Sequence, residues 1–392
     1  MLKIATLSSL YPSKSQPGKG VFIENRTAHL QKSADVEVRV IAPVPWFPFS
    51  SRRFGAYANY ARAPANDLRN GMSVDYPRYL VVPKLGMSLA PLLMAIGILG
   101  TFRELIRNGH DFDIIDAYYF YPDGVAAALV GKWMNKPVVI NALGTDVNVI
   151  PRYRVPRALI IWASNYASAI TTVSRALRQE LLNLGISGEK IHVNLHGVDH
   201  AQFTPPTTPL PQGDRPQRKA RTLLCVGNLL EAKGQHLAIE SLLHLKDFRL
   251  VLVGEGEYED KLRQQVSNLQ LEDRVQFAGH VDHAKLVSYY STSDALIIPS
   301  LREGIPNVIL ESLACGTPVI ATNVGGIPEI INSGVPGILL DDRTPMAIAN
   351  AVHQLFENYP SIHDVVEFSR QFTWAKTSAT QIKIFKAVLS LP

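Results

Sequence analysis

The sequence predicts an α/β protein built from two doubly wound, Rossmann-like domains. A chain of 392 residues is longer than one hydrophobic core usually requires, so two domains are expected. Short apolar runs alternate with helix-like segments from Ile4 to Val173 and again from Leu223 to Leu340, as in successive βαβ units. Between the two series, residues 204–220 are rich in proline and show neither helical nor strand periodicity, which predicts a linker.

The first series starts with an expected strand at Ile4–Ser8, a loop rich in Pro, Ser and Gly, and a helix at Phe22–Gln31. Ser174 is a good N-cap residue for a helix that follows the last strand of this series. The other expected elements are strands at Val36–Ala42, Asp113–Ile115, Pro137–Ile140, Ala169–Val173, Leu223–Val226 and Gly337–Leu340, and helices at Gly124–Trp133 and Ala375–Leu389.

The composition is that of a folded protein, with 46% hydrophobic and 19% charged residues. The two cysteines, Cys225 and Cys315, lie in apolar runs and are expected to be buried free thiols in a reducing, cytoplasmic compartment. Residues Met1–Leu7 resemble a first strand more than a signal peptide, because they lack a long apolar stretch and a cleavage site.

The net charge of +5 is unevenly distributed. Residues 1–200 hold 22 Lys and Arg against 14 Asp and Glu, whereas residues 201–392 hold 17 against 20. A basic N-terminal half suits nucleic acid, an anionic membrane or an anionic acceptor. The sequence contains no nucleic-acid-binding motif and its cations are scattered, so nucleic acid is not an expected partner.

Residues Leu85–Phe102 are uncharged and mostly apolar, close to the length of a membrane span. Pro91 and three glycines interrupt them, which favours a buried helix of the N-terminal domain. The preceding cations and aromatic residues predict either peripheral contact with an anionic bilayer or a plain solvated loop. These residues are Arg52, Arg53, Phe54, Tyr57, Tyr60, Arg62, Arg69, Tyr76, Arg78, Tyr79 and Lys84.

The most informative segment is Pro299–Glu311, in which Glu303 lies in a turn and Glu311 in a helix. Pro306 suits the first helical position, and Gly316 ends the helix. A helix N-terminus attracts phosphate, so two hydroxyl-binding carboxylates around it fit a nucleotide-sugar. The alternative is a charged residue at a helix start and a solvated glutamate on its exposed face.

Residues 312–329, which follow Glu311, resemble the signature of glycosyltransferase family 4. Further matches occur in the expected order at Cys225–Leu229, Lys233–Gly234, Val253–Gly256 and Asp294–Ser300. Members of this family are retaining, nucleotide-sugar-dependent enzymes with the GT-B fold. The resemblance implies an acceptor-binding domain at 1–203, a linker at 204–220, a nucleotide-sugar-binding domain at 221–374 across a cleft, and a C-terminal helix at 375–392 that returns to the first domain.

The resemblance also implies roles for residues of the second domain. Lys233 would stabilise the leaving diphosphate, Glu303 would bind the donor sugar and Glu311 the ribose. Many members have an arginine where this chain has Asn228, so Lys233, helix amides or another cation such as Arg302 would carry the phosphates. The remaining donor-binding residues implied are Gly304, Ile305, Asn307 and Val308 around the phosphates, and Gly279 and Val281 at the base.

In the first domain, the family places the loop that holds Gly18, Lys19 and Gly20 near the phosphates and acceptor. The segment Leu143–Asp146 matches a family segment that often begins with histidine, which is Leu143 here. Asp146 is a candidate to orient or deprotonate an acceptor hydroxyl, and an N-cap role is the alternative. Lys233, Glu303 and Asp146 are thus the predicted catalytic residues, and His196–Asp199 is interpreted as a structural turn.

No metal or other cofactor is expected. Asp111 and Asp113 resemble metal ligands of other glycosyltransferases, but they directly precede an apolar strand. GT-B enzymes generally use lysine and helix-end electrostatics in place of a metal.

The predicted function is transfer of a hexose from a nucleotide diphosphate, UDP being favoured, to a saccharide or lipid-linked saccharide of bacterial surface-polysaccharide synthesis. The predicted location is the cytoplasm, with peripheral contact at the inner face of the membrane. Two alternatives stay open: a GT-B-like nucleotide-sugar epimerase, and a non-catalytic nucleotide-sugar-binding protein, which the absent arginine and histidine would suit.

Overall fold

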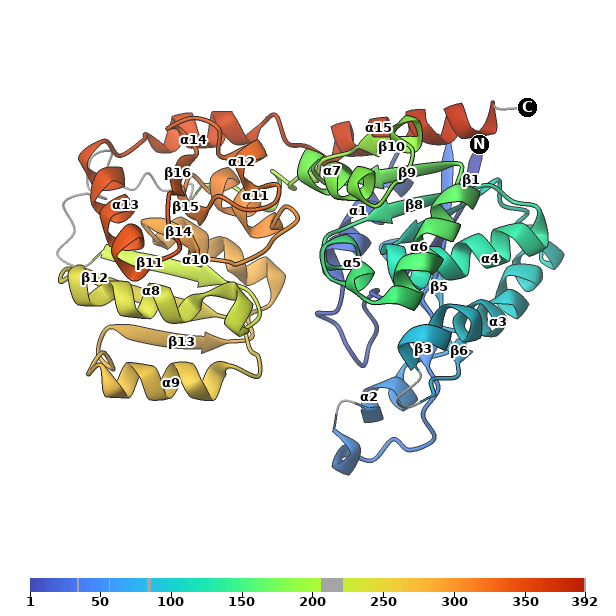
Figure 1. Cartoon of the computed structure of the whole chain (residues 1–392), viewed down its shortest axis with the longest axis horizontal. Helices are drawn as coiled ribbons and strands as arrows, with labels where there is room; N and C mark the ends of the chain where they lie inside the picture. Colours follow the sequence, from blue (N-terminus) through green and yellow to red (C-terminus); the bar gives the residue numbers. More distant parts are fainter. Residues whose placement is uncertain (34, 56, 83–85, 206–220, 391–392) are drawn as a thin grey trace. The chain divides into compact units, whose positions relative to one another are not determined.

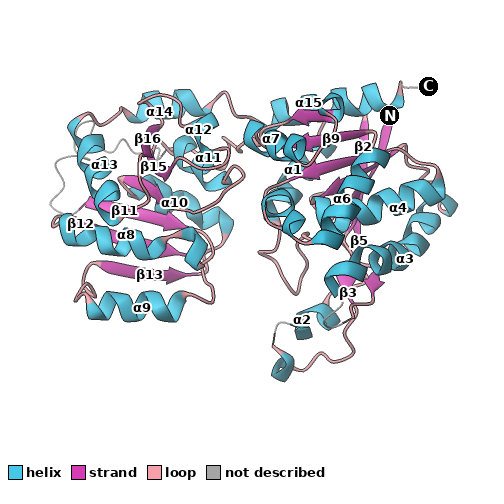
Figure 2. Ribbon diagram, in the orientation of Figure 1, coloured by secondary structure: helices cyan, strands magenta, loops and turns pink. Residues whose placement is uncertain are grey.

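The computed structural model describes residues 1–33, 35–55, 57–82, 86–205 and 221–390. The chain divides into two compact units, each of which is an α/β layer structure (Figure 1). Unit 1 comprises Met1–Leu195 and Trp374–Pro392, and unit 2 comprises His196–Thr373. Two α/β domains of the GT-B type were expected, and each unit is a doubly wound, mainly parallel sheet covered by helices (Figure 2).

Unit 1 is built on an eight-stranded sheet in the order β10-β9-β8-β7-β1-β2-β5-β4. All neighbouring strands are parallel except β4 and β5, which form an antiparallel hairpin at the edge. The strands are β1 Leu2–Leu7, β2 Val36–Ile41, β4 Asn66–Arg69, β5 Met72–Asp75, β7 Ile114–Tyr118, β8 Val138–Ala142, β9 Ala169–Thr172 and β10 Ile191–Val193.

The alternation of side chains along β1 sends Ile4 to one face of this sheet and Ala5 to the other, and a buried core forms on each face. One core includes residues of α3 Gly86–Arg107, α4 Val125–Met134, α6 Arg154–Tyr166 and α7 Arg175–Asn183. The other includes residues of α1 Val21–Gln31 and α15 Trp374–Leu389. The Ser174 hydroxyl accepts from the Leu177 amide, which confirms the predicted cap of α7.

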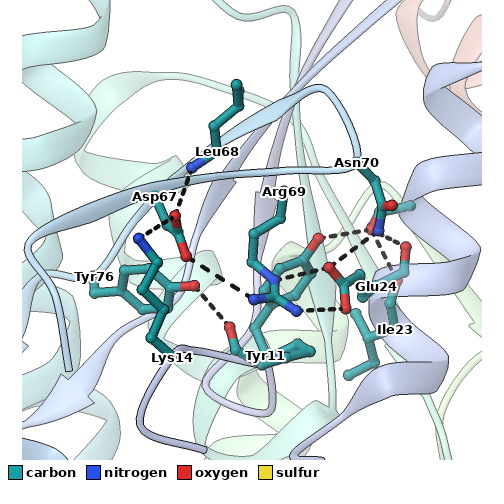
Figure 3. A network of polar contacts seen from close by, with 11 residues as sticks. Tyr11, Lys14, Ile23, Glu24, Asp67, Leu68, Arg69, Asn70 and Tyr76 are labelled. Atoms are coloured by element: carbon teal, nitrogen blue, oxygen red, sulfur yellow. Dashed lines mark hydrogen bonds and ion pairs between the residues drawn. The ribbon is translucent and has the colours of Figure 1, made fainter. Parts of the chain in front are cut away.

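The edge hairpin is fastened to α1 by an ion pair (Figure 3). Arg69 Nε donates to Glu24 Oε1 at 2.8 Å, and Asn70 Nδ2 donates to the same carboxylate at 3.1 Å. The Glu24 side chain is only 8% exposed, so its charge is matched inside the unit. Arg69, which was expected among cations facing a membrane or solvent, is therefore a structural residue of the hairpin.

The last helix, α15, belongs to unit 1, as predicted, and begins at Trp374. It is held there by a buried polar network centred on Gln381, which is 1% exposed. The Gln381 carbonyl accepts from Arg26 at 2.8 Å and from Asn194 at 2.9 Å, while its amide donates to Asp116 at 3.1 Å. One side chain near the C-terminus thus joins α1, β7 and the chain beyond β10.

Unit 2 is built on a six-stranded parallel sheet in the order β13-β12-β11-β14-β15-β16. The strands are β11 Arg221–Val226, β12 Phe248–Val253, β13 Val275–Gly279, β14 Ala295–Ile298, β15 Val319–Thr322 and β16 Gly337–Leu340. The helices are α8 Gln235–Ser241, α9 Glu259–Asn268, α10 Leu286–Thr292, α11 Asn307–Ala314, α12 Ile327–Ile330, α13 Pro345–Glu357 and α14 Ile362–Ser369. Cys225 and Cys315 are buried thiols outside any disulfide, as predicted.

Two sequence-based boundaries differ from the structure. The first domain was placed at 1–203, whereas the units separate between Leu195 and His196, because Phe203 packs on rings of unit 2. Pro306 was placed inside its helix, but its ψ of 122° makes it the N-cap of α11. Residues 206–220 of the predicted linker lie outside the described residues.

We expect Gln381→Ala to lower the stability of unit 1 by about 1–3 kcal/mol, because Arg26 and Asp116 would each lose a buried hydrogen-bond partner. Calorimetric unfolding of the full chain measures this as a lower midpoint for one transition. Lys383→Ala, an exposed change on the same helix, is the control and should shift the stability by less than about 0.5 kcal/mol. Equal midpoints for both variants would contradict the role given to Gln381.

Candidate functional site

The candidate site of unit 2 lies where the order of its strands reverses. From β11 the sheet grows through β12 to β13 on one side and then from β14 to β16 on the other. In open α/β sheets, ligands bind outside the carboxyl ends of the two strands at such a point. A cavity of about 290 Å³ lies here. It is lined by Cys225, Val226, Gly227, Asn228, Lys233, Gln235, Ile297, Ile298, Pro299, Ser300, Glu303, Pro306, Asn307 and Val308.

Two loops, one after β11 and one after β14, are packed tightly together beside this cavity. The Leu301 amide donates to the Ala232 carbonyl at 2.7 Å. Gly234 has a φ of 76°, and a Cβ there would lie 2.1 Å from the Pro299 carbonyl oxygen. Only glycine therefore allows this approach, which brings the neighbouring Lys233 towards the β14 loop.

The approach places a cation against a carboxylate at the cavity wall. Lys233 Nζ lies 2.6 Å from Glu303 Oε1, and both side chains line the cavity. The Lys233 side chain is 33% exposed and that of Glu303 is 11% exposed. The structure thus brings together two of the three predicted catalytic residues.

The N-terminus of α11 contributes to the same lining. Asn307 and Val308 line the cavity, and amides in the first turn of a helix have no carbonyl partner within it. These amides and the helix dipole favour an anion. The Asn307 side chain is fixed by His196, whose Nδ1 lies 2.6 Å from Asn307 Oδ1. His196 was interpreted as a turn residue, and this contact was not foreseen.

Asn228, which replaces the arginine of many family members, also lines the cavity. Its carbonyl accepts from Gln235 Nε2 at 3.1 Å, and Gln235 was not predicted as a site residue. Arg302, the proposed substitute cation, is exposed and is not among the described residues that line the cavity. Lys233 is consequently the cation that the described lining offers to a phosphate.

The other predicted donor-binding residues of unit 2 lie outside the lining of this cavity. They are Gly279, Val281, Gly304, Ile305 and Glu311. Ile305 is 6% exposed, so its side chain is part of the core. Gly279 and Val281 lie at and just after the end of β13.

Glu311 is nearly buried and is held by two side chains that the sequence did not reveal. His283 Nε2 lies 2.9 Å from Glu311 Oε1, and the Tyr290 hydroxyl donates to Oε2 at 2.8 Å. Burial by itself would lower the pKa of His283, but the Glu311 carboxylate raises it above its usual value. Glu311 is therefore a fixed carboxylate, not a solvated one on an exposed helix face.

Unit 1 has its own reversal point, between β1 and β7. There the Asp123 carboxylate accepts from the Ser9 amide and, at 2.9 Å, from the Ser9 hydroxyl. Burial raises the pKa of Asp123 to about 7 and lowers that of Lys19, whose ammonium the Asp123 charge partly stabilises. The loop of Gly18 and Gly20 follows β1, and a Cβ on Gly20 would lie 1.8 Å from the Leu10 carbonyl oxygen.

Asp146 is not placed to act on an acceptor. Its side chain is 0% exposed, and its carboxylate accepts from the amides of Phe120 at 2.6 Å, Gly144 at 2.7 Å and Leu143 at 3.2 Å. Burial raises the pKa of Asp146, and these amides oppose the rise. The predicted catalytic role is therefore corrected: Asp146 holds the loops after β7 and β8 together.

The two acidic residues considered as metal ligands are occupied by neighbours. Asp111 pairs with Lys136 at 2.7 Å, and Asp113 accepts from the Lys3 amide at 2.7 Å. Among the described residues, no group of three or more His, Cys, Asp or Glu side chains could hold a metal ion.

Comparison with known families covers most of the chain. Residues 18–202 match the model of Glycosyltransferase Family 4, and residues 210–372 match that of Glycosyl transferases group 1. The chain belongs to glycosyltransferase family 4. The expected family is thereby confirmed, and nothing in these matches favours an epimerase.

Relatives and solved structures agree with this assignment. The glycosyltransferase is 29% identical over 366 residues to a putative teichuronic acid biosynthesis glycosyltransferase, TuaC, of Bacillus subtilis, which covers 90% of this chain and 88% of that protein. Its fold is similar to sucrose-phosphate synthase of Thermosynechococcus elongatus, with a TM-score of 0.78 at 17% identity over 100% of both chains. Anabaena HepE in complex with UDP-glucose has a TM-score of 0.71 at 20% identity, again over 100% of both chains. The GT-B fold is thus confirmed.

The raised pKa of Asp123 predicts how stability depends on pH. The Asp123 carboxyl ionises near pH 4 in the unfolded chain, but in the folded protein it stays protonated until about pH 7. Its contribution to the free energy of unfolding is therefore full at low pH and is lost as the pH rises through 7. We expect Asp123→Asn, which is neutral at every pH, to gain thermal stability relative to the wild type between pH 5 and pH 8.

The control for this experiment is Asp111→Asn, an exposed change in the same unit, which should show no such gain. Melting curves of the three proteins at pH 5 and pH 8 provide the measurement. If the difference between Asp123→Asn and wild type were the same at both pH values, Asp123 would not carry the raised pKa.

Proposed function

We propose that this glycosyltransferase moves a hexose from UDP to a saccharide acceptor with retention of configuration at the anomeric carbon. The observation that supports this most is the cavity at the β11/β14 reversal point, which is lined both by the Lys233–Glu303 pair and by the first residues of α11. Such a site offers positive charge to a diphosphate and a carboxylate to sugar hydroxyls within one small volume.

Each part of the site has a distinct task in the proposed reaction. The amides of Asn307 and Val308 bind the diphosphate, and Lys233 neutralises the charge that grows on it as the bond to the sugar breaks. Glu303 accepts hydrogen bonds from sugar hydroxyls and, through its ion pair, keeps Lys233 at the cavity wall. Glu311 binds the ribose. No side chain of the site is assigned as a covalent nucleophile.

The proposed donor and pathway draw on the similar proteins. Anabaena HepE was solved with UDP-glucose, which supports a UDP-sugar. The Bacillus subtilis relative is named for teichuronic acid biosynthesis, which supports an acceptor in surface-polysaccharide assembly. The acceptor proposed for this chain is a saccharide, free or lipid-linked, on the cytoplasmic side of the membrane.

Transfer is proposed to need no metal ion, because Lys233 and the end of α11 supply the positive charge at the leaving diphosphate. We therefore expect full transfer activity in excess chelator, and a fall of about 10²–10³ in kcat for Lys233→Met. Arg302→Met is the matched control, since it removes an exposed cation outside the cavity lining and should leave kcat nearly unchanged. The measurement is sugar transfer from UDP-hexose to added acceptor saccharide, with the anomer of the product assigned by NMR.

Three outcomes would count against the proposal. A product with inverted configuration at the anomeric carbon would show that transfer does not proceed with retention. Activity that disappears with chelator and returns with manganese would show that transfer requires a metal ion. Equal activity of Lys233→Met and Arg302→Met would show that Lys233 does not stabilise the leaving group.

The chain is also proposed to contact an anionic bilayer through unit 1. Helix α3 is apolar and long enough to span a membrane by length and composition, and 28% of its most apolar window is buried in the unit. Its Met94, Ala95, Ile98 and Phe102 are 0% exposed, and Gly97 lies against β6 Arg78–Tyr79. Because one side of α3 packs on the unit and the other is exposed, we propose that it lies on a membrane rather than crossing it.

Several apolar side chains in this part of the chain are nevertheless exposed. In Figure 1 an arm, residues 46–55 and 57–62, extends from unit 1 beyond β3 Val44–Pro45 and includes α2 Tyr57–Arg62. Within it, Phe49 stacks on Phe54, their ring centroids 5.0 Å apart, while Trp46, Phe49 and Tyr57 are each more than half exposed. Further along the chain, the exposed apolar residues are Leu80, Val81, Val82, Met87, Leu89, Leu92 and Ile96.

The charges around the arm differ in part from those expected. Arg53 and Arg62 are exposed there, and Arg53 lies over the Phe54 ring at 5.0 Å. Arg78, however, donates to the Tyr76 carbonyl at 3.1 Å and is structural, as is Arg69. Exposed aromatic residues beside two cations suit the interface of an anionic bilayer.

We expect wild-type protein to bind anionic vesicles at low salt and to release them partly as salt rises. Phe49→Ser with Tyr57→Ser should weaken this binding by about tenfold or more, because two apolar anchors are lost, and Arg53→Gln with Arg62→Gln should reduce its dependence on salt. Trp133→Ser, which removes an exposed aromatic residue on α4, is the control. Vesicle co-sedimentation measures the binding of the wild type and of the three variants. If wild-type protein does not bind anionic vesicles at low salt, the proposed membrane contact is wrong and a soluble acceptor is the better proposal.

A further inference from the structure

The ribose carboxylate proposed above, Glu311, is held in place from both sides. Tyr290, on α10 and 0% exposed, donates to Oε2, and His283, in the turn before α10, contacts Oε1 at 2.9 Å. The Glu311 side chain keeps 10% of its surface exposed and that of His283 keeps 28%. A glutamate side chain has three rotatable bonds, so two separate contacts are needed to fix both oxygens.

His283 is itself positioned by the segment that opens unit 2. The Gln202 amide nitrogen lies 3.4 Å from His283 Nδ1, and the Phe203 ring packs edge-on against the imidazole at a centroid distance of 5.0 Å. Because an ionised carboxylate only accepts, the Nε2 that contacts Glu311 carries a proton and donates to Oε1, while Nδ1 faces the Gln202 amide. Phe203 also contacts the Tyr290 ring, with centroids 6.0 Å apart, so one side chain supports both partners of Glu311.

The two hydrogen bonds leave Glu311 able to bind a ligand. Each carboxylate oxygen has two lone pairs, so one remains on each oxygen for a ribose hydroxyl. Glu311 lies four residues after Asn307, about 6 Å further along α11 at the helical rise. A nucleotide with its diphosphate at the start of α11 would therefore place its ribose about one helical turn further along.

We propose that His283 is a positioning residue for the ribose: by holding the Glu311 carboxylate, it sets the affinity for the nucleotide and the preference for ribose over a sugar without hydroxyls. This inference rests on the proposed donor site. It adds to that site a residue that does not line the phosphate cavity and that lies in the turn between β13 and α10.

Two substitutions of similar size separate this role from simple packing. In His283→Gln the side-chain amide reaches the place of Nε2 and can still donate to Glu311. In His283→Asn the shorter amide reaches only the place of Nδ1, so the contact with Glu311 is lost while a polar side chain remains. His283→Ala also lacks the contact with Glu311. Because its side chain is small, it serves as a second test if the asparagine variant does not fold.

The experiment is calorimetric titration of each protein with UDP and with 2′,3′-dideoxy-UDP, alongside GDP and ADP and their dideoxy forms. We expect the ribose preference of the wild type to fall by about tenfold in His283→Asn and His283→Ala, as for the loss of one charge-assisted hydrogen bond, and to be largely restored in His283→Gln. The donor KM should rise while kcat changes little, since the reacting bond is not touched.

Glu311→Ala distinguishes failure of this inference from failure of the donor site. If Glu311→Ala keeps the full ribose preference for every nucleotide, the proposed ribose site is wrong, whatever His283 does. If Glu311→Ala abolishes the preference but His283→Asn and His283→Ala keep it, the donor site stands and the role of His283 is overturned. Loss of the preference in His283→Gln as well as in His283→Asn would also overturn it, because packing alone would then explain the effect.

Discussion

The hydrogen bond from the Leu301 amide to the Ala232 carbonyl joins the two loops that carry the charges of the candidate site. Lys233 and Glu303 are 70 residues apart in the sequence, yet their side chains meet at 2.6 Å. Their meeting requires the close approach of backbone at Gly234, which no residue with a Cβ allows. The position of the cation, and with it the proposed stabilisation of a leaving diphosphate, therefore depends on how two loops pack and not on either loop alone.

Both units place polar side chains at the reversal point of their sheets, but they use them differently. In unit 2, Lys233 and Glu303 line a cavity and keep part of their surface exposed. In unit 1, Asp123 is fully buried against Ser9 and raised in pKa, and Asp146 is enclosed by backbone amides. A buried carboxylate satisfied by amides holds loops in place, whereas a partly exposed one can bind a substrate.

The cationic side chains of unit 1 also fall into two groups, those paired inside the fold and those exposed at the surface. Arg69 is matched by Glu24 at the edge hairpin, and Arg26 lies in the network of Gln381. Arg53 and Arg62 remain exposed beside the aromatic arm. The excess of cations counted in residues 1–200 therefore overstates the charge available to a partner, because part of it serves the fold.

The sequence by itself determined the series of strands and helices, the cap at Ser174, the burial of both cysteines and the family. These follow from patterns between residues that are close along the chain, such as apolar periodicity, capping and motif spacing. Only the tertiary structure decided that Asp146 is enclosed, that Phe203 belongs to unit 2, and that His283 and Tyr290 hold Glu311. In each case the deciding partner comes from another element of the fold, and the sequence does not show which distant groups will desolvate a side chain or hydrogen-bond to it.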